Sequence, residues 1–207
     1  MHDHSHPHSH AHGHDRGAFA FFHYLKFFPE LWQSKMNRAV VELIAPRAGE
    51  QVVDLGAGIG AATVLAARSG ATVHAVDPTP FMRRFLRLRT GWRSNVRVVD
   101  GAAESMPLPA ASVDALWTVN TIHHWTDRPA AARELARVLR PGARVVLVDE
   151  DFDDPAQPEH REHRASVFDA VEPTAIAESL RAAGFATAEG AKTMLAGRPT
   201  KTVRAVR

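Results

Sequence analysis

The sequence predicts a doubly wound α/β fold, in which helices cover both faces of a mostly parallel sheet. From residue 52 onward, short β-branched segments alternate with helical ones, a pattern typical of parallel strands joined by crossover helices. A glycine-rich turn follows the first of these segments and opens the first helix, as in nucleotide-binding crevices. With 207 residues, the chain is long enough for one such domain and too short for two.

The first strand and its turn occupy residues 52–60, which read VVDLGAGIG. Gly56 and Gly58 can adopt backbone angles closed to other residues and let a ligand lie against the main chain. Together with Ala61 they also satisfy the G-x-G-x-x-G/A dinucleotide fingerprint, so the glycines alone are weak evidence. A carboxylate at Asp54 would repel a diphosphate, which favours a cationic or hydroxyl-rich ligand.

The remaining elements follow in a regular order. Gly70, Gly91 and Gly184 stop three of the helices, and Pro141-Gly142 closes another. Helices are expected at 59–69, 81–89, 129–139 and 174–183, and strands at Thr72–Val76, Val96–Val99, Val113–Val119 and 144–148.

Asp77 should be the second ligand contact. It ends the second strand, where nucleotide crevices place an acid that accepts hydrogen bonds from ribose hydroxyls. An acid in a turn before Pro78 is also common for purely structural reasons. Its coincidence with the glycine turn favours the binding interpretation, with Pro78 at the pocket edge.

These features resemble the class I S-adenosylmethionine-dependent methyltransferases, whose first motif reads V-x-D-L-G-x-G-x-G. The stretch His123-His124-Trp125 is similar to one often found in their type 11 subgroup, which acts on small molecules. The resemblance covers about residues 36–207 and implies a Rossmann-like seven-stranded sheet completed by an antiparallel hairpin, expected at 185–189 and 202–206. It implies methyl transfer from S-adenosylmethionine to a small-molecule acceptor, whose oxygen, nitrogen or carbon nucleophile stays open. The cofactor residues it implies are Asp54, Gly56, Ala57, Gly58, Gly60, Asp77, Pro78, Ala102, Ala103 and Asn120.

The adenine segment departs from the family pattern. Relatives often read G-D-A-E where this chain reads Gly101-Ala102-Ala103-Glu104, so Ala102 cannot supply the carboxylate that accepts from the adenine amino group. We expect backbone groups of Ala102 and Ala103 to meet the ring edge, and Asp100 or Glu104 to offer a carboxylate instead. One lost charge-assisted hydrogen bond costs on the order of 1.5 to 3 kcal/mol.

The catalytic candidates are His124 and, beside it, His123. A histidine here could deprotonate an acceptor hydroxyl, since its ordinary pKa lies near physiological pH, or it could only brace the loop. A base is not obligatory, because the sulfonium is already an activated donor and alignment supplies much of the rate. The acids at 149–151, followed by Asp153, Asp154, His160 and His163, could hold a cationic acceptor, although a solvated loop is the favoured interpretation.

The N-terminus is a different kind of segment. Residues 1–16 are expected to form a disordered tail that binds Zn²⁺ or Ni²⁺ without catalytic use. The tail ligands would be His2, His4, His6, His8, His10, His12 and His14. Residues 17–47 are aromatic and then helical. The cluster at 19–28 is a candidate lid over an apolar acceptor, and 48–207 is the expected methyltransferase core.

Composition and charge limit the other classes. The absence of cysteine excludes disulfides and thiolate nucleophiles, and the longest apolar run is too short to cross a membrane. We therefore expect a cytoplasmic protein. Two alternatives stay open: an RNA or DNA methyltransferase that uses the arginine-rich surface between Arg83 and Arg97, and a metal-binding or metal-responsive protein on a degenerate methyltransferase fold. The arginine run is more often a solvated helix face.

Overall fold

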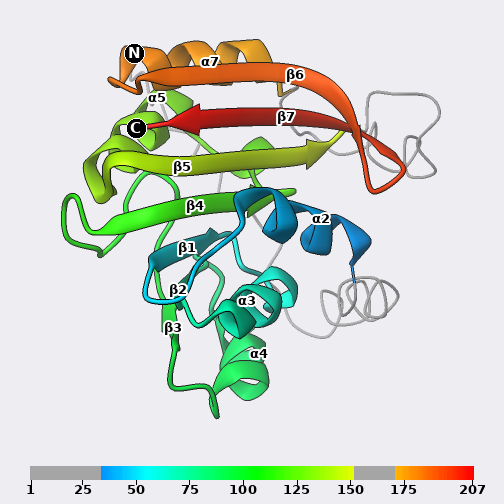
Figure 1. Cartoon of the computed structure of the whole chain (residues 1–207), viewed down its shortest axis with the longest axis vertical. Coiled ribbons are helices and arrows are strands. Elements are labelled where there is room, and N and C mark those ends of the chain that lie inside the picture. Colours follow the sequence, from blue (N-terminus) through cyan, green and yellow to red (C-terminus); the bar gives the residue numbers. More distant parts are fainter. Residues whose placement is uncertain (1–33, 152–170) are drawn as a thin grey trace, which may run out of the picture.

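A computed structural model describes residues 34–151 and 171–207 and confirms the predicted fold class (Figure 1). Its core is a seven-stranded sheet in the order β3-β2-β1-β4-β5-β7-β6, in which β7 runs antiparallel to both of its neighbours. The strands are β1 (Gln51–Leu55), β2 (Thr72–Val76), β3 (Val96–Val99), β4 (Val113–Val119), β5 (Leu139–Glu150), β6 (Thr187–Leu195) and β7 (Arg198–Val206).

Helices cover both faces of the sheet (Figure 1). One face carries α2 (Lys35–Ile44), α3 (Ala61–Ala66) and α4 (Pro80–Thr90), and the other carries α5 (Arg128–Val138) and α7 (Pro173–Ala182). The apolar residues alternate accordingly, because neighbouring side chains of a strand point to opposite faces. Val52 packs with α2 and α3, whereas Val53 packs with α5 and α7. Within the described residues, none of the helices is long and apolar enough to cross a membrane.

Several predicted boundaries differ from those of the structure. Helix α3 begins at Ala61 with Gly60 as its N-cap, and its last turn is a 3₁₀ turn, Ala67–Ser69. Helix α5 ends at Val138, and β5 already begins at Leu139, because Leu139 pairs with Val113 before the register shifts around Pro141-Gly142. The C-terminal hairpin is longer than expected, since Ala196 and Gly197 both adopt the positive φ of a two-residue turn.

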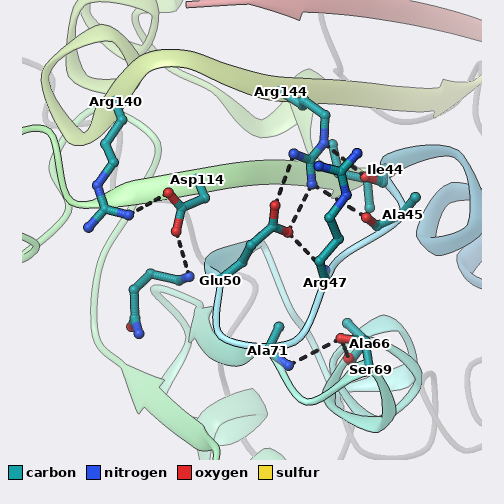
Figure 2. Close-up of polar contacts among 11 residues, drawn as sticks. Ile44, Ala45, Arg47, Glu50, Ala66, Ser69, Ala71, Asp114, Arg140 and Arg144 are labelled. Carbon is teal, nitrogen blue, oxygen red and sulfur yellow. Dashed lines mark hydrogen bonds and ion pairs between the residues drawn. The ribbon is translucent and has the colours of Figure 1, made fainter.

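Arg144, near the middle of β5, holds the end of α2 against the sheet (Figure 2). Its guanidinium bonds both carboxylate oxygens of Glu50, at 3.0 and 2.9 Å. It also donates to the carbonyls of Ile44 (3.3 Å) and Ala45 (3.4 Å), which the end of α2 leaves without helical partners. Burial alone would raise the pKa of Glu50, but the bonds from Arg144 and from the backbone of Arg47 leave that pKa lowered. This polar cluster holds the helix end in place.

We expect Arg144→Met to destabilise the protein by about 2 kcal/mol, because it removes charge-assisted bonds to Glu50, whose side chain is 15% exposed, while keeping the apolar stem. Urea denaturation followed by tryptophan fluorescence measures the loss. Arg140→Met is the matched control, since Arg140 is 45% exposed and should cost well under 1 kcal/mol. Equal losses in the two variants would contradict the assignment.

Candidate active site

The glycine turn after β1 lies where the carboxyl ends of the parallel strands meet. The N–H groups of Gly56 and Ala57 both donate to the carbonyl of Val76, at 2.8 and 3.0 Å, which ties the turn to the end of β2. A Cβ on Gly56 would lie 1.9 Å from the methyl of Thr121, so the loop after β4 packs directly on this glycine. Gly60 is equally confined, because a Cβ there would meet Leu86 at 2.4 Å.

Gly58 is the open position of the turn. Its φ is +53°, and a Cβ built there meets nothing within 4 Å. Its N–H donates to the Asp77 carboxylate at 2.8 Å, while the other Asp77 oxygen accepts from the N–H of Thr79 at 2.8 Å. Each carboxylate oxygen can accept more than one hydrogen bond. The turn therefore offers bare backbone beside a buried acid, as a nucleoside site requires.

Asp54 does not point into open space. It is 3% exposed, and its carboxylate accepts from the Thr63 hydroxyl of α3 at 2.5 Å. Burial raises its pKa to about 6, despite that hydrogen bond. The prediction that Asp54 faces a ligand is therefore not supported by this geometry, in which Asp54 joins β1 to α3 beneath the glycine turn.

The raised pKa of Asp54 predicts a pH-dependent stability. The folded state holds this proton more tightly than the unfolded chain, whose reference value is 3.8, so the stabilisation is complete below pH 4 and is lost as the pH rises through about 6. The loss amounts to about 3 kcal/mol by pH 7.5. Relative to the wild type, Asp54→Asn should therefore gain about that much stability between pH 4 and 7.5 in urea denaturation.

Asp114→Asn provides a control of opposite sign. Burial would raise the pKa of Asp114, but hydrogen bonds from Arg140 and from the backbone of Gln51 leave it lowered. Its contribution is therefore present at neutral pH and is lost on acidification. Parallel stability curves for the wild type and Asp54→Asn would contradict the assignment to Asp54.

The segment after β3 is arranged differently from expectation. The N–H and carbonyl of Ala102 pair with Ser105, at 3.0 and 3.1 Å, so these backbone groups already have partners. Glu104 accepts from the backbone of Thr126 at 2.8 Å and of Asp127 at 3.2 Å. Its carboxylate is thus used at the start of α5, and it is a poor substitute for the missing adenine acid. Ala103 is 4% exposed and lies in the core beside β2.

Asp100 is not available as a substitute acid either, because its carboxylate forms an ion pair with a buried arginine. Arg83 is 8% exposed and forms a two-pronged ion pair with Asp100, with both N···O distances at 2.8 Å. It also donates to the carbonyl of Asp77 at 2.9 Å. Arg83 therefore does not belong to the solvated arginine face that the sequence predicts. Arg84, Arg87 and Trp92 are exposed, as that interpretation expects.

Asp149, near the end of β5, accepts hydrogen bonds from the backbone of the loop after β4. It is 2% exposed and accepts from the N–H groups of Thr121 (2.9 Å), Ile122 (3.2 Å) and His123 (3.1 Å). The Nδ1 atom of His123 lies 2.8 Å from the same carboxylate. His124 is exposed, with its ring centroid 4.1 Å from that of His123. The two histidines therefore differ: His123 is bound to Asp149, and His124 reaches the surface.

The acids at 149–151 are not solvated, contrary to the favoured interpretation. Glu150 is 9% exposed; it pairs with Arg198 at 2.7 Å, and its backbone N–H donates to the Asn120 side chain at 2.8 Å. Asp151 is 3% exposed and pairs with Lys192 at 2.9 Å and with Lys201 at 3.3 Å. Cationic partners from the C-terminal hairpin, which sequence spacing does not reveal, allow these acids to be buried.

Asn120 adopts the left-handed backbone conformation, with φ at +54°. Its N–H donates to the carbonyl of Val148 at 2.8 Å, and its side chain donates to Glu150 at 3.2 Å. Pro78 directly follows Asp77 at the end of β2 and is exposed. The structure thus brings together the glycine turn, Asp77 and the loop from Asn120 to His124 at one edge of the sheet.

Several predictions lie outside the described residues. They are the tail histidines from His2 to His14, the aromatic cluster at 19–28 and the acids and histidines at 153–163. Within residues 34–151 and 171–207, no group of three or more histidine or acidic side chains is arranged to hold a metal ion.

Comparison with known proteins places this geometry in context. Residues 53–147 match the family model described as a methyltransferase domain. An uncharacterized methyltransferase of Mycobacterium bovis is 43% identical over 108 residues, which cover 52% of this chain and 43% of that protein. The demethylmenaquinone methyltransferase of Tropheryma whipplei is 34% identical over 121 residues, covering 58% of this chain and 49% of that protein. The chain thus matches about half the length of these relatives.

Solved structures share the fold. The phosphoethanolamine N-methyltransferase 2 of Haemonchus contortus, in complex with S-adenosyl-L-methionine, has a TM-score of 0.75 at 17% identity. The match covers 91% of this chain and 57% of that one. At this identity the likeness concerns the fold.

Proposed function

We propose that this chain, which belongs to the class I S-adenosylmethionine-dependent methyltransferases, transfers the methyl group of that cofactor to a small-molecule acceptor. The observation that carries the proposal is the bond between Gly58 and Asp77, which sets an open stretch of backbone against a buried acid. The cofactor, when bound, supplies an electrophilic methyl on a sulfonium. The protein has to bind it, align the acceptor and exclude water.

The proposed cofactor residues would have different roles. Asp77 would accept from the ribose hydroxyls, and Gly56, Ala57 and Gly58 would lie against the methionine part. Gly60, Pro78, Ala103 and Asn120 would form the edges of the site. Asp54 would support the turn from below rather than touch the cofactor, since Thr63 already occupies its carboxylate. Ala102 would contribute shape only. The Haemonchus contortus enzyme, whose fold this chain shares, was solved in complex with S-adenosyl-L-methionine, which supports binding of that cofactor by this fold.

Of the two histidines, His124 is the better candidate for a general base. It is exposed at the carboxyl end of β4, whereas His123 is held by Asp149 and braces the loop. A small aromatic acceptor is supported by the name of one relative, the demethylmenaquinone methyltransferase of Tropheryma whipplei, which names a quinone-type substrate. Residues 48–207 would form the catalytic core, and the aromatic cluster at 19–28 would cover the acceptor.

The testing experiment has two steps. Calorimetric titration of S-adenosylmethionine into the full chain should give micromolar binding. Release of S-adenosylhomocysteine is then measured with a reduced naphthoquinone, a catechol, phosphoethanolamine and an RNA oligonucleotide as acceptors. Turnover of a small molecule supports the proposal, and turnover of the RNA alone favours the nucleic-acid alternative, for which exposed Arg84, Arg87 and Trp92 offer a surface. Absence of cofactor binding overturns the proposal.

A further inference from the structure

Arg83 is an unusual residue for a helix that lies on the sheet surface. It belongs to α4, whose neighbouring arginines Arg84 and Arg87 are exposed, yet it is itself 8% exposed. Burying a guanidinium is costly unless hydrogen bonds and an opposite charge compensate. The compensation comes from the carbonyl of Asp77 at 2.9 Å and from the carboxylate of Asp100 at 2.8 Å. Apolar side chains in place of a buried ion pair often leave the stability of a protein unchanged or raise it. Stability alone therefore does not explain why an arginine is buried at this position, and the location of its two partners becomes informative.

The two partners of Arg83 lie in separate loops. Asp77 follows β2 and holds Gly58 through its carboxylate. Asp100 follows β3 and directly precedes Gly101 and Ala102, where the adenine acid of the family pattern is missing. The loops are already linked once, because the N–H of Asp77 donates to Val99 at 3.2 Å. The planar guanidinium adds a second link, and its fork reaches both loops at the same time.

We infer that Arg83 is a positioning residue for the adenosine half of the cofactor site. The inference rests on the proposed function. The ion pair with Asp100 and the bond to the Asp77 carbonyl set the spacing between the ribose acid and the segment from Gly101 to Ala103. Ala102 offers no carboxylate to bind the adenine ring. The affinity for adenosine therefore depends more on the spacing between Asp77 and the segment from Gly101 to Ala103. Arg83 acts through its two partners and does not itself contact the cofactor.

The test measures cofactor affinity in the full chain by calorimetry, with S-adenosylmethionine and with 5′-methylthioadenosine, which lacks the amino-acid part. Arg83→Gln should weaken both ligands by about tenfold, the loss expected for a charge-assisted hydrogen bond. The two ligands should weaken equally, since both carry the adenosine half. Arg84→Gln, an exposed neighbour on the same helix, should leave both affinities unchanged.

A second variant approaches the same contact from the surface. The Asp100 side chain is 70% exposed, and Arg83 keeps its bond to the Asp77 carbonyl, so Asp100→Ala should lose stability but still fold, and it should weaken both ligands several-fold. Asp100→Ala therefore tests the inference even if Arg83→Gln does not fold. A wild-type protein that binds, with Arg83→Gln or Asp100→Ala indistinguishable from Arg84→Gln, overturns this inference alone. A loss of affinity confined to S-adenosylmethionine overturns it as well. A wild-type protein without cofactor binding overturns the proposed function too.

Discussion

Asp77→Ala should weaken S-adenosylmethionine binding at least 100-fold. The substitution removes the acceptor for the N–H groups of Gly58 and Thr79, so the glycine turn keeps only the bonds of Gly56 and Ala57 to the end of β2. It also removes the carboxylate proposed to accept from the ribose hydroxyls. Two charge-assisted hydrogen bonds at about 1.5 kcal/mol each account for a loss of this size. Calorimetric titration of the full chain measures it directly.

Two further variants separate the causes of this loss. Asp77→Asn keeps one acceptor oxygen and should lose less affinity than Asp77→Ala, because the bond to Gly58 can persist. Glu189→Ala removes an exposed acid on β6 and should bind like the wild type. Affinity of Asp77→Ala within threefold of the wild type would mean that Asp77 serves the fold alone.

Asp149→Ala should destabilise the protein by about 4 kcal/mol. The side chain is the common acceptor for the N–H groups of Thr121, Ile122 and His123 and for the His123 ring. Its removal leaves three backbone N–H groups at buried or half-buried positions without this acceptor, which costs more than the loss of one hydrogen bond. Urea denaturation followed by tryptophan fluorescence gives the change in the free energy of unfolding.

The same variant should also reduce methyl transfer. The methyl of Thr121 packs on Gly56, so a loosened loop after β4 disturbs the glycine turn as well as His124. Asp127→Ala is the control for stability, since Asp127 accepts one N-cap bond from Ala130 and should cost about 1 kcal/mol. The role given to Asp149 is wrong if the two variants lose the same stability.

Local patterns account for what could be predicted. The strands Thr72–Val76, Val96–Val99 and Val113–Val119 have the predicted bounds, because β-branched runs between turn residues specify a buried strand locally. The glycine turn and Asp77 meet as expected, since parallel strands bring their carboxyl ends to one edge of a sheet. The start of β5 was missed, because it depends on pairing with Val113 rather than on the Pro-Gly signal.

By itself, the sequence determined the fold class, the order of helices and strands along the chain and the place of the glycine turn, because these depend on residues close together in the chain. Only the tertiary structure decided which charges are buried. Arg83 meets an acid 17 positions away, and Asp149 meets a loop 28 positions away, near Thr121. Contacts of this kind depend on which elements lie side by side, and the pattern of charges along the chain does not contain that information.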